Sequence, residues 1–273
     1  MVFQLSKTWR CLAICVALIA VMLCPSTWSS PVVRPQQSTS LTVSAAISLK
    51  DALDELGALY ERAHADIKLT FNYGGSGTLQ HQVEQGAPVD IFFSAAEKQM
   101  DRLESEGLLL SGTRADLLGN ALVLITPAGD SAIHDFAGLS SSTVRTIALG
   151  EPSTVPAGMY ARQTLDRLGL FAALRKKIVY AKDVRAVLAY VETGNADAGL
   201  VYQTDARTSS KVRIAAVAPP ETHDPIVYPA AVLKSSRNPE AARAFLDFLE
   251  GSQARAIFER YGFLAAKNQP KKN

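Results

Sequence analysis

The amino-acid sequence predicts an α/β protein. Short apolar or β-branched runs alternate along the chain with longer segments in which apolar residues recur every three or four positions. The first pattern is typical of buried strands and the second of amphipathic helices. Their alternation favours largely parallel sheets with helices on the faces. With 273 residues, of which 48% are hydrophobic, the chain is long enough for one large or two medium domains.

The N-terminal segment differs from the rest of the chain. Lys7 and Arg10 precede an uncharged apolar run over residues 11–24, and a serine-rich cluster follows Pro25. This layout predicts a signal peptide over residues 1–30. The run is shorter than the ~20 residues of a spanning helix, which favours a cleaved signal over an uncleaved N-terminal anchor. Residues 31–40, rich in proline, glutamine and serine, are expected to form a solvated linker.

The cysteines all lie in the predicted signal peptide, at Cys11, Cys15 and Cys24. We therefore expect no disulfide and no thiolate metal site in the mature protein. A lipid anchor on Cys24 is not expected, because Val21-Met22-Leu23 before it lacks the small residue of a lipoprotein cleavage site.

Net charge argues against two classes of partner. The chain has 28 basic and 26 acidic residues, and loss of Lys7 and Arg10 with the signal peptide leaves 26 of each. A neutral chain without a basic block lacks the electrostatic footprint for nucleic acid or for an anionic membrane surface.

The mature chain divides into alternating strands and helices, with no internal repeat. Strands are expected at residues 41–45, 67–71, 89–94, 121–126, 146–149, 177–180, 198–202, 212–216 and 226–231. Helices are expected at residues 49–63, 78–85, 99–106, 159–168, 184–193 and 239–250.

Four of the strand-to-helix turns are rich in small residues. They are Ala45 to Ser48, Tyr73 to Gly77, Glu151 to Gly158 and Ala181 to Val184. Ligands of open α/β sheets bind at the carboxyl ends of strands, where such turns lie. Helix N-termini offer unpaired N–H groups and a partial positive charge, so these turns suit an anion without any lysine or arginine. Ser48 and Ser76 add hydroxyl donors.

Other interpretations of the same residues stay open. Each serine, taken alone, is also consistent with a role as helix N-cap. Tyr202 is equally consistent with a residue at the edge of the core and with a hydroxyl donor to a ligand. Gly74-Gly75-Ser76-Gly77-Thr78 matches neither nucleotide-binding glycine motif and lacks the last glycine of the hydrolase nucleophile elbow. His81 is the nearest candidate base for Ser76, but on a helix it points away. Asp183 is expected to be the N-cap of the helix that follows it.

With these turns, the sequence resembles the periplasmic molybdate-binding proteins of ABC importers, the ModA family. The resemblance covers residues 41–263. Its landmarks are the segments 45–49, 74–79, 85–90, 155–160, 183–185, 199–202 and 260–263, which include Gly-Gly-Ser-Gly-Thr-Leu and Val-Pro-Ala-Gly-Met-Tyr. Glycine at Gly74, Gly75 and Gly77 departs from the serine-richer turn of many relatives.

The resemblance implies a two-lobed periplasmic binding protein type II fold, with a mainly parallel sheet in each lobe and a two-strand hinge. One lobe would comprise residues 41–119 and 227–273, and the other residues 120–226. It also implies which groups bind the oxyanion. They are the hydroxyls of Ser48, Ser76 and Tyr202 and the backbone N–H groups of Ala157 and Val184.

The implied function is capture of molybdate or tungstate in the periplasm and delivery to the permease of an ABC importer. The chain would act as a monomer, without catalytic residues, cofactor or metal other than the molybdenum of its ligand. A sulfate or other small-anion receptor and a secreted serine hydrolase using Ser76 remain the alternatives. Five donors without a carboxylate acceptor disfavour hydrogen phosphate, whose proton needs an acceptor. Nothing in the sequence separates molybdate from tungstate.

Overall fold

A computed structural model describes residues 38–129 and 132–266. The predicted signal peptide, most of the predicted linker and the last residues of the chain lie outside them. β1 begins at Thr39, so the last two residues of the predicted linker already belong to a strand. In the part of the chain that is described, no helix is long and apolar enough to cross a membrane.

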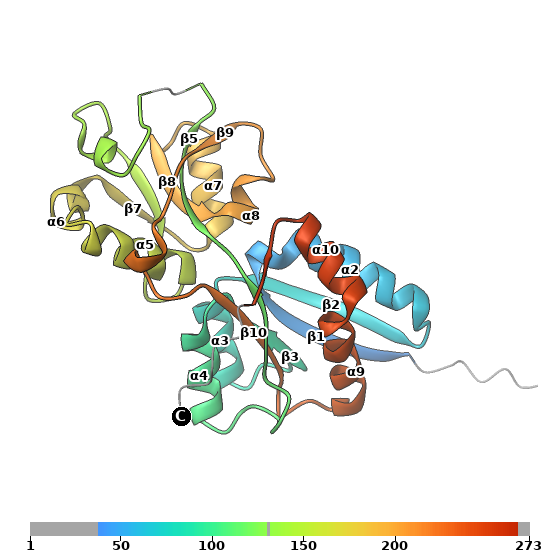
Figure 1. Cartoon of the computed structure of the whole chain (residues 1–273). Helices are drawn as coiled ribbons and strands as arrows, with labels where there is room; N and C mark the ends of the chain where they lie inside the picture. The colour runs from blue at the N-terminus through green and yellow to red at the C-terminus, as the bar shows by residue number, and fades with distance from the viewer. Residues whose placement is uncertain (1–37, 130–131, 267–273) are drawn as a thin grey trace, which may run out of the picture. The chain divides into compact units, whose positions relative to one another are not determined.

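The first sheet has the strand order β11-β4-β10-β3-β1-β2. Its strands are β1 (Thr39–Ala46), β2 (Ile67–Gly74), β3 (Ile91–Phe93), β4 (Ala115–Gly119), β10 (Val227–Val232) and β11 (Leu264–Ala265). Its helices are η1 (Ile47–Leu49), α2 (Lys50–Ala63), α3 (Ser76–Glu84), α4 (Glu97–Ser105), α9 (Pro239–Glu250) and α10 (Ser252–Arg260). Helices α2, α9 and α10 pack together on one face of this sheet, and α3 and α4 on the other (Figure 1).

The second sheet has the order β7-β6-β8-β5-β9. Its strands are β5 (Leu122–Pro127), β6 (Ile147–Gly150), β7 (Ile178–Ala181), β8 (Ala198–Tyr202) and β9 (Val212–Val217). The helices around it are η2 (Ala137–Ser140), α5 (Pro156–Arg167), α6 (Phe171–Leu174), η3 (Arg175–Lys177), α7 (Val184–Glu192), α8 (Gln203–Ala206) and η4 (Pro220–Thr222). The molecule is therefore a two-lobed α/β protein with one sheet in each lobe, called here the first and the second lobe.

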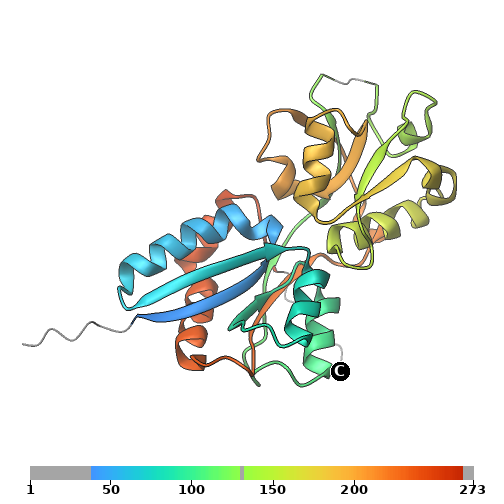
Figure 2. The same ribbon diagram turned by 180° about the vertical axis from the view of Figure 1, so that it is seen from behind.

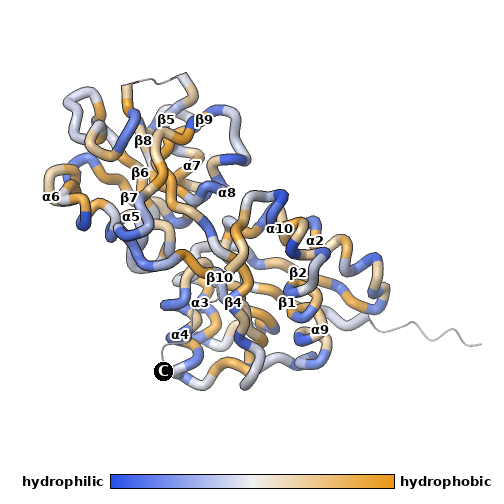
Figure 3. The backbone as a smooth tube through the Cα atoms, in the orientation of Figure 1, coloured by the Kyte–Doolittle hydropathy of each residue, from blue (hydrophilic) through white to orange (hydrophobic). Residues whose placement is uncertain are grey.

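Burial explains why these segments form strands and helices. In β1, Leu41, Val43 and Ala45 are fully buried, and in α2 the buried Leu53, Leu56 and Tyr60 recur at helical spacing. Figure 3 shows hydrophobic residues concentrated along the strands. Each sheet is thus buried between helices that turn an apolar stripe towards it.

Both sheets are mixed, with parallel strands joined by antiparallel ones. In the first sheet β1 pairs in parallel with β2 and β3, and Figure 2 shows β1 and β2 side by side, but the other pairings are antiparallel. In the second sheet β6 pairs in parallel with β7 and β8, whereas β5 pairs antiparallel with β8 and β9. The reason is that β5 and β10 follow segments that come from the other lobe. They enter without a helical crossover and so run in the opposite direction.

Every strand and helix expected from the sequence is present, with ends displaced by at most three residues. The unexpected elements include β4, β11 and α10. β4 precedes β5 and β9 precedes β10, so two segments of chain pass between the lobes, as Figure 1 shows.

Candidate functional site

The five residues expected to bind the anion lie together. Ser48, Ser76, Ala157, Val184 and Tyr202 all line one cavity between the two lobes. The other lining residues are Ala46, Ile47, Gly74, Gly75, Ala95, Val155 and Pro156, so no lining residue carries a charged side chain. The space open to water within this cavity is about 10 Å³, roughly one water molecule. A larger guest requires the lining groups to move apart.

Ser48 and Ser76 come from the first lobe and are both buried. Ser48 lies in η1 directly after β1, and Ser76 is the first residue of α3. Neither makes a side-chain cap hydrogen bond. Instead, the Ser76 Oγ accepts a 3.0 Å hydrogen bond from the N–H of Ala95, and the Ser48 Oγ lies 3.1 Å from the Oη of Tyr228. The interpretation of these serines as N-caps is therefore wrong.

Ala157 and Val184 contribute backbone groups from the second lobe. Ala157 is the second residue of α5 and Val184 the first of α7, where N–H groups have no partner within the helix. Within the described residues neither N–H donates to a protein acceptor. The Asp183 side chain accepts from the N–H of Ala186 at 2.8 Å, which confirms it as the N-cap of α7. Its carboxylate is thereby engaged with the helix.

Tyr202 ends β8 and is almost fully buried. Burial raises the pKa of its hydroxyl well above the usual value, so the group keeps its hydrogen at neutral pH. The Oη donates to the carbonyl of Ala95 in the first lobe over 3.3 Å. That distance is at the long end for an O–H donor, so an anion in the cavity can compete for this hydrogen.

Further contacts join the lobes beside the cavity. The N–H of Gly77 in α3 donates to the carbonyl of Thr154, in the turn before α5, at 2.8 Å. The guanidinium of Arg185 in α7 bonds Asp51 in α2 at 2.6 Å, and also bonds the buried Asp205. Arg185 follows Val184 directly in the sequence, yet its guanidinium pairs with two carboxylates outside the cavity.

A hydrolase based on Ser76 needs a base within hydrogen-bond reach of the hydroxyl. His81 lies five residues later, but its Nδ1 is 2.9 Å from a carboxylate oxygen of Glu84 and its side chain is 59% exposed. The Ser76 hydroxyl is bonded to a backbone N–H, which cannot take a proton. This arrangement lacks the features of an activated nucleophile.

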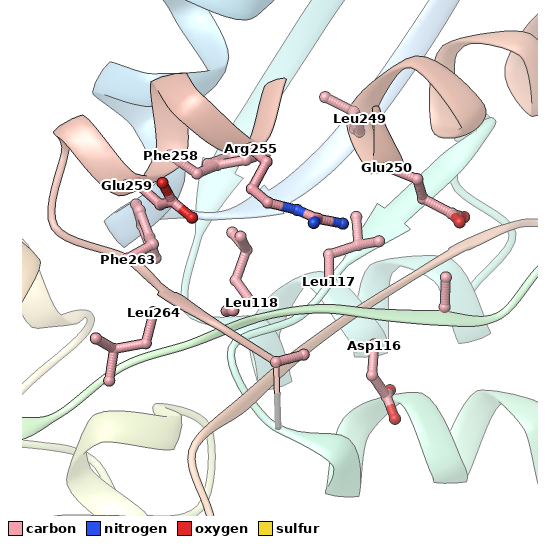
Figure 4. A pocket seen from close by; sticks show the side chains of 13 residues that line it. Asp116, Leu117, Leu118, Leu249, Glu250, Arg255, Phe258, Glu259, Phe263 and Leu264 are labelled. Carbon is pink, nitrogen blue, oxygen red and sulfur yellow. The ribbon is translucent and has the colours of Figure 1, made fainter. Parts of the chain in front are cut away.

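A second cavity, of about 280 Å³, lies entirely on the first lobe. Figure 4 shows Arg255 extending across it between Glu259 and Glu250, and Asp116 also lines it. None of the predicted site residues is among its lining residues. Three carboxylates against one guanidinium would repel a dianion, so this cavity does not suit the chemistry expected from the turns.

Comparisons with known proteins show the family of the chain. The model of a family described as bacterial extracellular solute-binding proteins matches residues 41–264. YvgL of Bacillus subtilis (strain 168), named as a substrate-binding lipoprotein of an ABC transporter, is 45% identical over 91% of this chain and 95% of its own. The molybdate-binding protein ModA of Haemophilus influenzae is 38% identical over 84% of this chain and 91% of its own.

A solved structure shows the same fold. The periplasmic molybdate-binding protein of Azotobacter vinelandii matches with a TM-score of 0.75 and 28% identity, over 83% of this chain and 100% of that chain. Sequence and fold therefore agree over nearly all of the described residues, and the chain belongs to the family of bacterial extracellular solute-binding proteins.

Proposed function

We propose that this protein captures molybdate or tungstate between its two lobes and delivers it to the permease of an ABC importer. The observation that carries the proposal is the single cavity lined by Ser48 and Ser76 from one lobe and by Ala157, Val184 and Tyr202 from the other. The names of the relatives from Haemophilus influenzae and Azotobacter vinelandii support the choice of ligand.

The donor set explains how an anion can bind without a countercharge. Hydrogen bonds to an ionised acceptor contribute roughly 1.5–3 kcal/mol each, and the cavity offers three hydroxyls and two free backbone N–H groups. The N-termini of α5 and α7 add their helix dipoles. Because donors come from both lobes, the ligand would stabilise the closed arrangement, and closure would signal to the permease that cargo is present.

The absence of a charged lining residue favours fully deprotonated oxyanions. Molybdate, tungstate and sulfate need donors only, whereas hydrogen phosphate also needs an acceptor. We propose a binding role without catalysis for the same site, with no cofactor.

Isothermal titration of the purified protein with molybdate, tungstate, sulfate and hydrogen phosphate tests this function. Molybdate and tungstate should bind most tightly, and a hundredfold excess over Kd should add about 2.7 kcal/mol of stability, seen as a higher melting temperature. Tightest binding of sulfate would support the small-anion receptor instead. If none of the four anions binds, the proposed function is wrong.

The proposal includes the organisation of the chain. The lobes would be residues 41–119 with 227–273, and residues 120–226, and the two segments that pass between the sheets would act as the hinge. We further propose export to the periplasm by a signal peptide over residues 1–30 and no lipid on Cys24, although the relative YvgL is named as a lipoprotein. Mass spectrometry of the exported protein tests both points, and its elution from a sizing column tests the expected monomer.

A further inference from the structure

Ser48 contacts a side chain that lies behind the cavity. Its Oγ is 3.1 Å from the Oη of Tyr228 on β10, and both groups are buried. Tyr228 does not line the cavity, so it acts on a ligand only through a neighbour. Burial also raises the pKa of the Tyr228 hydroxyl well above its usual value, so this group keeps its hydrogen at neutral pH.

The amide of Asn120 fixes the other side of the Tyr228 hydroxyl. The Asn120 Oδ1 accepts from the N–H of Ala121 at 2.9 Å, and a backbone N–H can only donate. The Nδ2 must therefore face the hydroxyls, where it lies 3.1 Å from the Tyr228 Oη and 2.9 Å from the Thr204 Oγ1. Toward Tyr228 the amide is a donor, so the tyrosine oxygen accepts from it and the tyrosine hydrogen is available to Ser48.

The Ser48 hydroxyl has a single hydrogen. If that hydrogen goes to an oxyanion, the buried Oγ needs a donor of its own or stays incompletely bonded, which is costly away from water. The Tyr228 Oη, which can donate its hydrogen, lies 3.1 Å from the Ser48 Oγ. Donors then point in one direction, from Asn120 through Tyr228 and Ser48 to the anion, and each bond polarises the next.

We propose that Tyr228, held by Asn120, is a positioning residue that fixes Ser48 as a hydrogen-bond donor and thereby favours fully deprotonated oxyanions over hydrogen phosphate. The inference rests on the proposed function. Ser76 has an equivalent partner in the N–H of Ala95 at 3.0 Å. Each serine oxygen thus accepts from a protein group, and less accepting capacity is left for the proton of hydrogen phosphate.

Replacement Tyr228→Phe tests the inference because it removes the hydroxyl and keeps the ring, which packs against Tyr202 and Phe263. Loss of one neutral hydrogen bond corresponds to roughly three- to tenfold weaker molybdate binding. The ratio of molybdate to hydrogen phosphate affinity should also fall, since Ser48 can then turn and accept. Tyr160→Phe is the matched control. It removes a buried hydroxyl that bonds the Pro225 carbonyl, and it should change neither quantity.

A double variant distinguishes positioning from a structural role. In the Ser48→Ala background, Tyr228→Phe should raise the Kd for molybdate much less than it does in the wild type, because the effect that passes through Ser48 is already lost. If the two substitutions weaken binding additively, or if Tyr228→Phe alone matches the wild type in Kd and in the affinity ratio, the inference is overturned.

A second variant covers the case in which Tyr228→Phe does not fold. Asn120→Asp keeps the acceptor for Ala121 but turns the donor into an acceptor, which draws the Tyr228 hydrogen away from Ser48. It should lower the same affinity ratio, and an unchanged ratio would overturn the inference. A wild-type protein that binds none of the anions would instead refute the proposed function itself.

Discussion

Replacement of Gly77 by alanine tests whether the two lobes approach each other this closely in the ligand-bound state. A Cβ atom at this position would lie 2.6 Å from the Cα and 2.8 Å from the carbonyl oxygen of Thr154 in the opposite lobe. Carbon atoms in contact prefer about 3.5–4 Å. Gly77→Ala therefore has to separate the lobes by roughly 1 Å at this point, because the atoms it meets are backbone.

The cost to binding follows from the bonds that this separation breaks. The Gly77 N–H bond to Thr154 contributes about 1 kcal/mol. A displacement of about 1 Å stretches a hydrogen bond beyond its useful range, so at least one bond from the second lobe to the anion, roughly 1.5–3 kcal/mol, is also lost. The sum of about 2.5–4 kcal/mol predicts molybdate binding weaker by roughly a hundredfold to a thousandfold.

The fold without ligand should respond in the opposite sense. Alanine is favoured over glycine within a helix by roughly 0.5–1 kcal/mol, and Gly77 is the second residue of α3. We therefore expect the melting temperature without molybdate to stay level or rise, while the ligand-induced shift shrinks. Titration calorimetry and thermal melting measure both quantities. Gly129→Ala is the control, since its Cβ would meet no atom within 4 Å. Wild-type affinity in Gly77→Ala would refute closure as described here.

Other perturbations address single groups. Ser48→Ala should weaken molybdate binding by roughly 10–100-fold in the same titration, because it removes one donor to an ionised acceptor. Asp51→Asn breaks the ion pair with Arg185 between the lobes, and should weaken binding severalfold at low salt and less at high salt, because Asp51 is 40% exposed. Burial raises the pKa of Asp205 to about 6 against the opposing effect of Arg185. The folded state therefore holds the Asp205 proton more tightly than the unfolded state does. Protonation of Asp205 then adds about 3 kcal/mol to the free energy of unfolding. This contribution is complete below pH ~4 and is lost as the pH rises through about 6. Melting curves from pH 4 to 7 should lose that component in Asp205→Asn.

Local pattern was sufficient to predict most strands and helices. β8, with Leu200 and Val201 in an uninterrupted apolar run, is an example. The sequence pattern did not predict the elements that bury few side chains. In α10 only Ala254 and Phe258 are buried, and β11 is a two-residue edge strand with both residues exposed. The start of α5 was placed three residues late, although proline at its first position, Pro156, is a helix-start signal.

The site was predictable to the extent that it is local. The turns and the family resemblance together indicated five residues that now line one cavity, and their role in binding stays a prediction. Tyr228 and Asn120 were missed, because Tyr228 lies 180 residues from Ser48 and 108 from Asn120. No periodicity reports such contacts. The bond between Gly77 and Thr154 was missed for the same reason, since the two residues belong to different turns and different lobes.

The structure separates the groups proposed to hold the anion from the charges that join the lobes. A lysine or arginine in the cavity would be buried without a partner whenever the site is empty, at a cost that neutral donors largely avoid. Arg185 is the nearest cation in sequence to Val184, and its charge is balanced by Asp51 and Asp205. In the proposed transport cycle, a permease that pulls the lobes apart would break the partly buried pair of Arg185 and Asp51 and the Gly77 bond. Release then requires no change in the charge of any group that contacts the ligand.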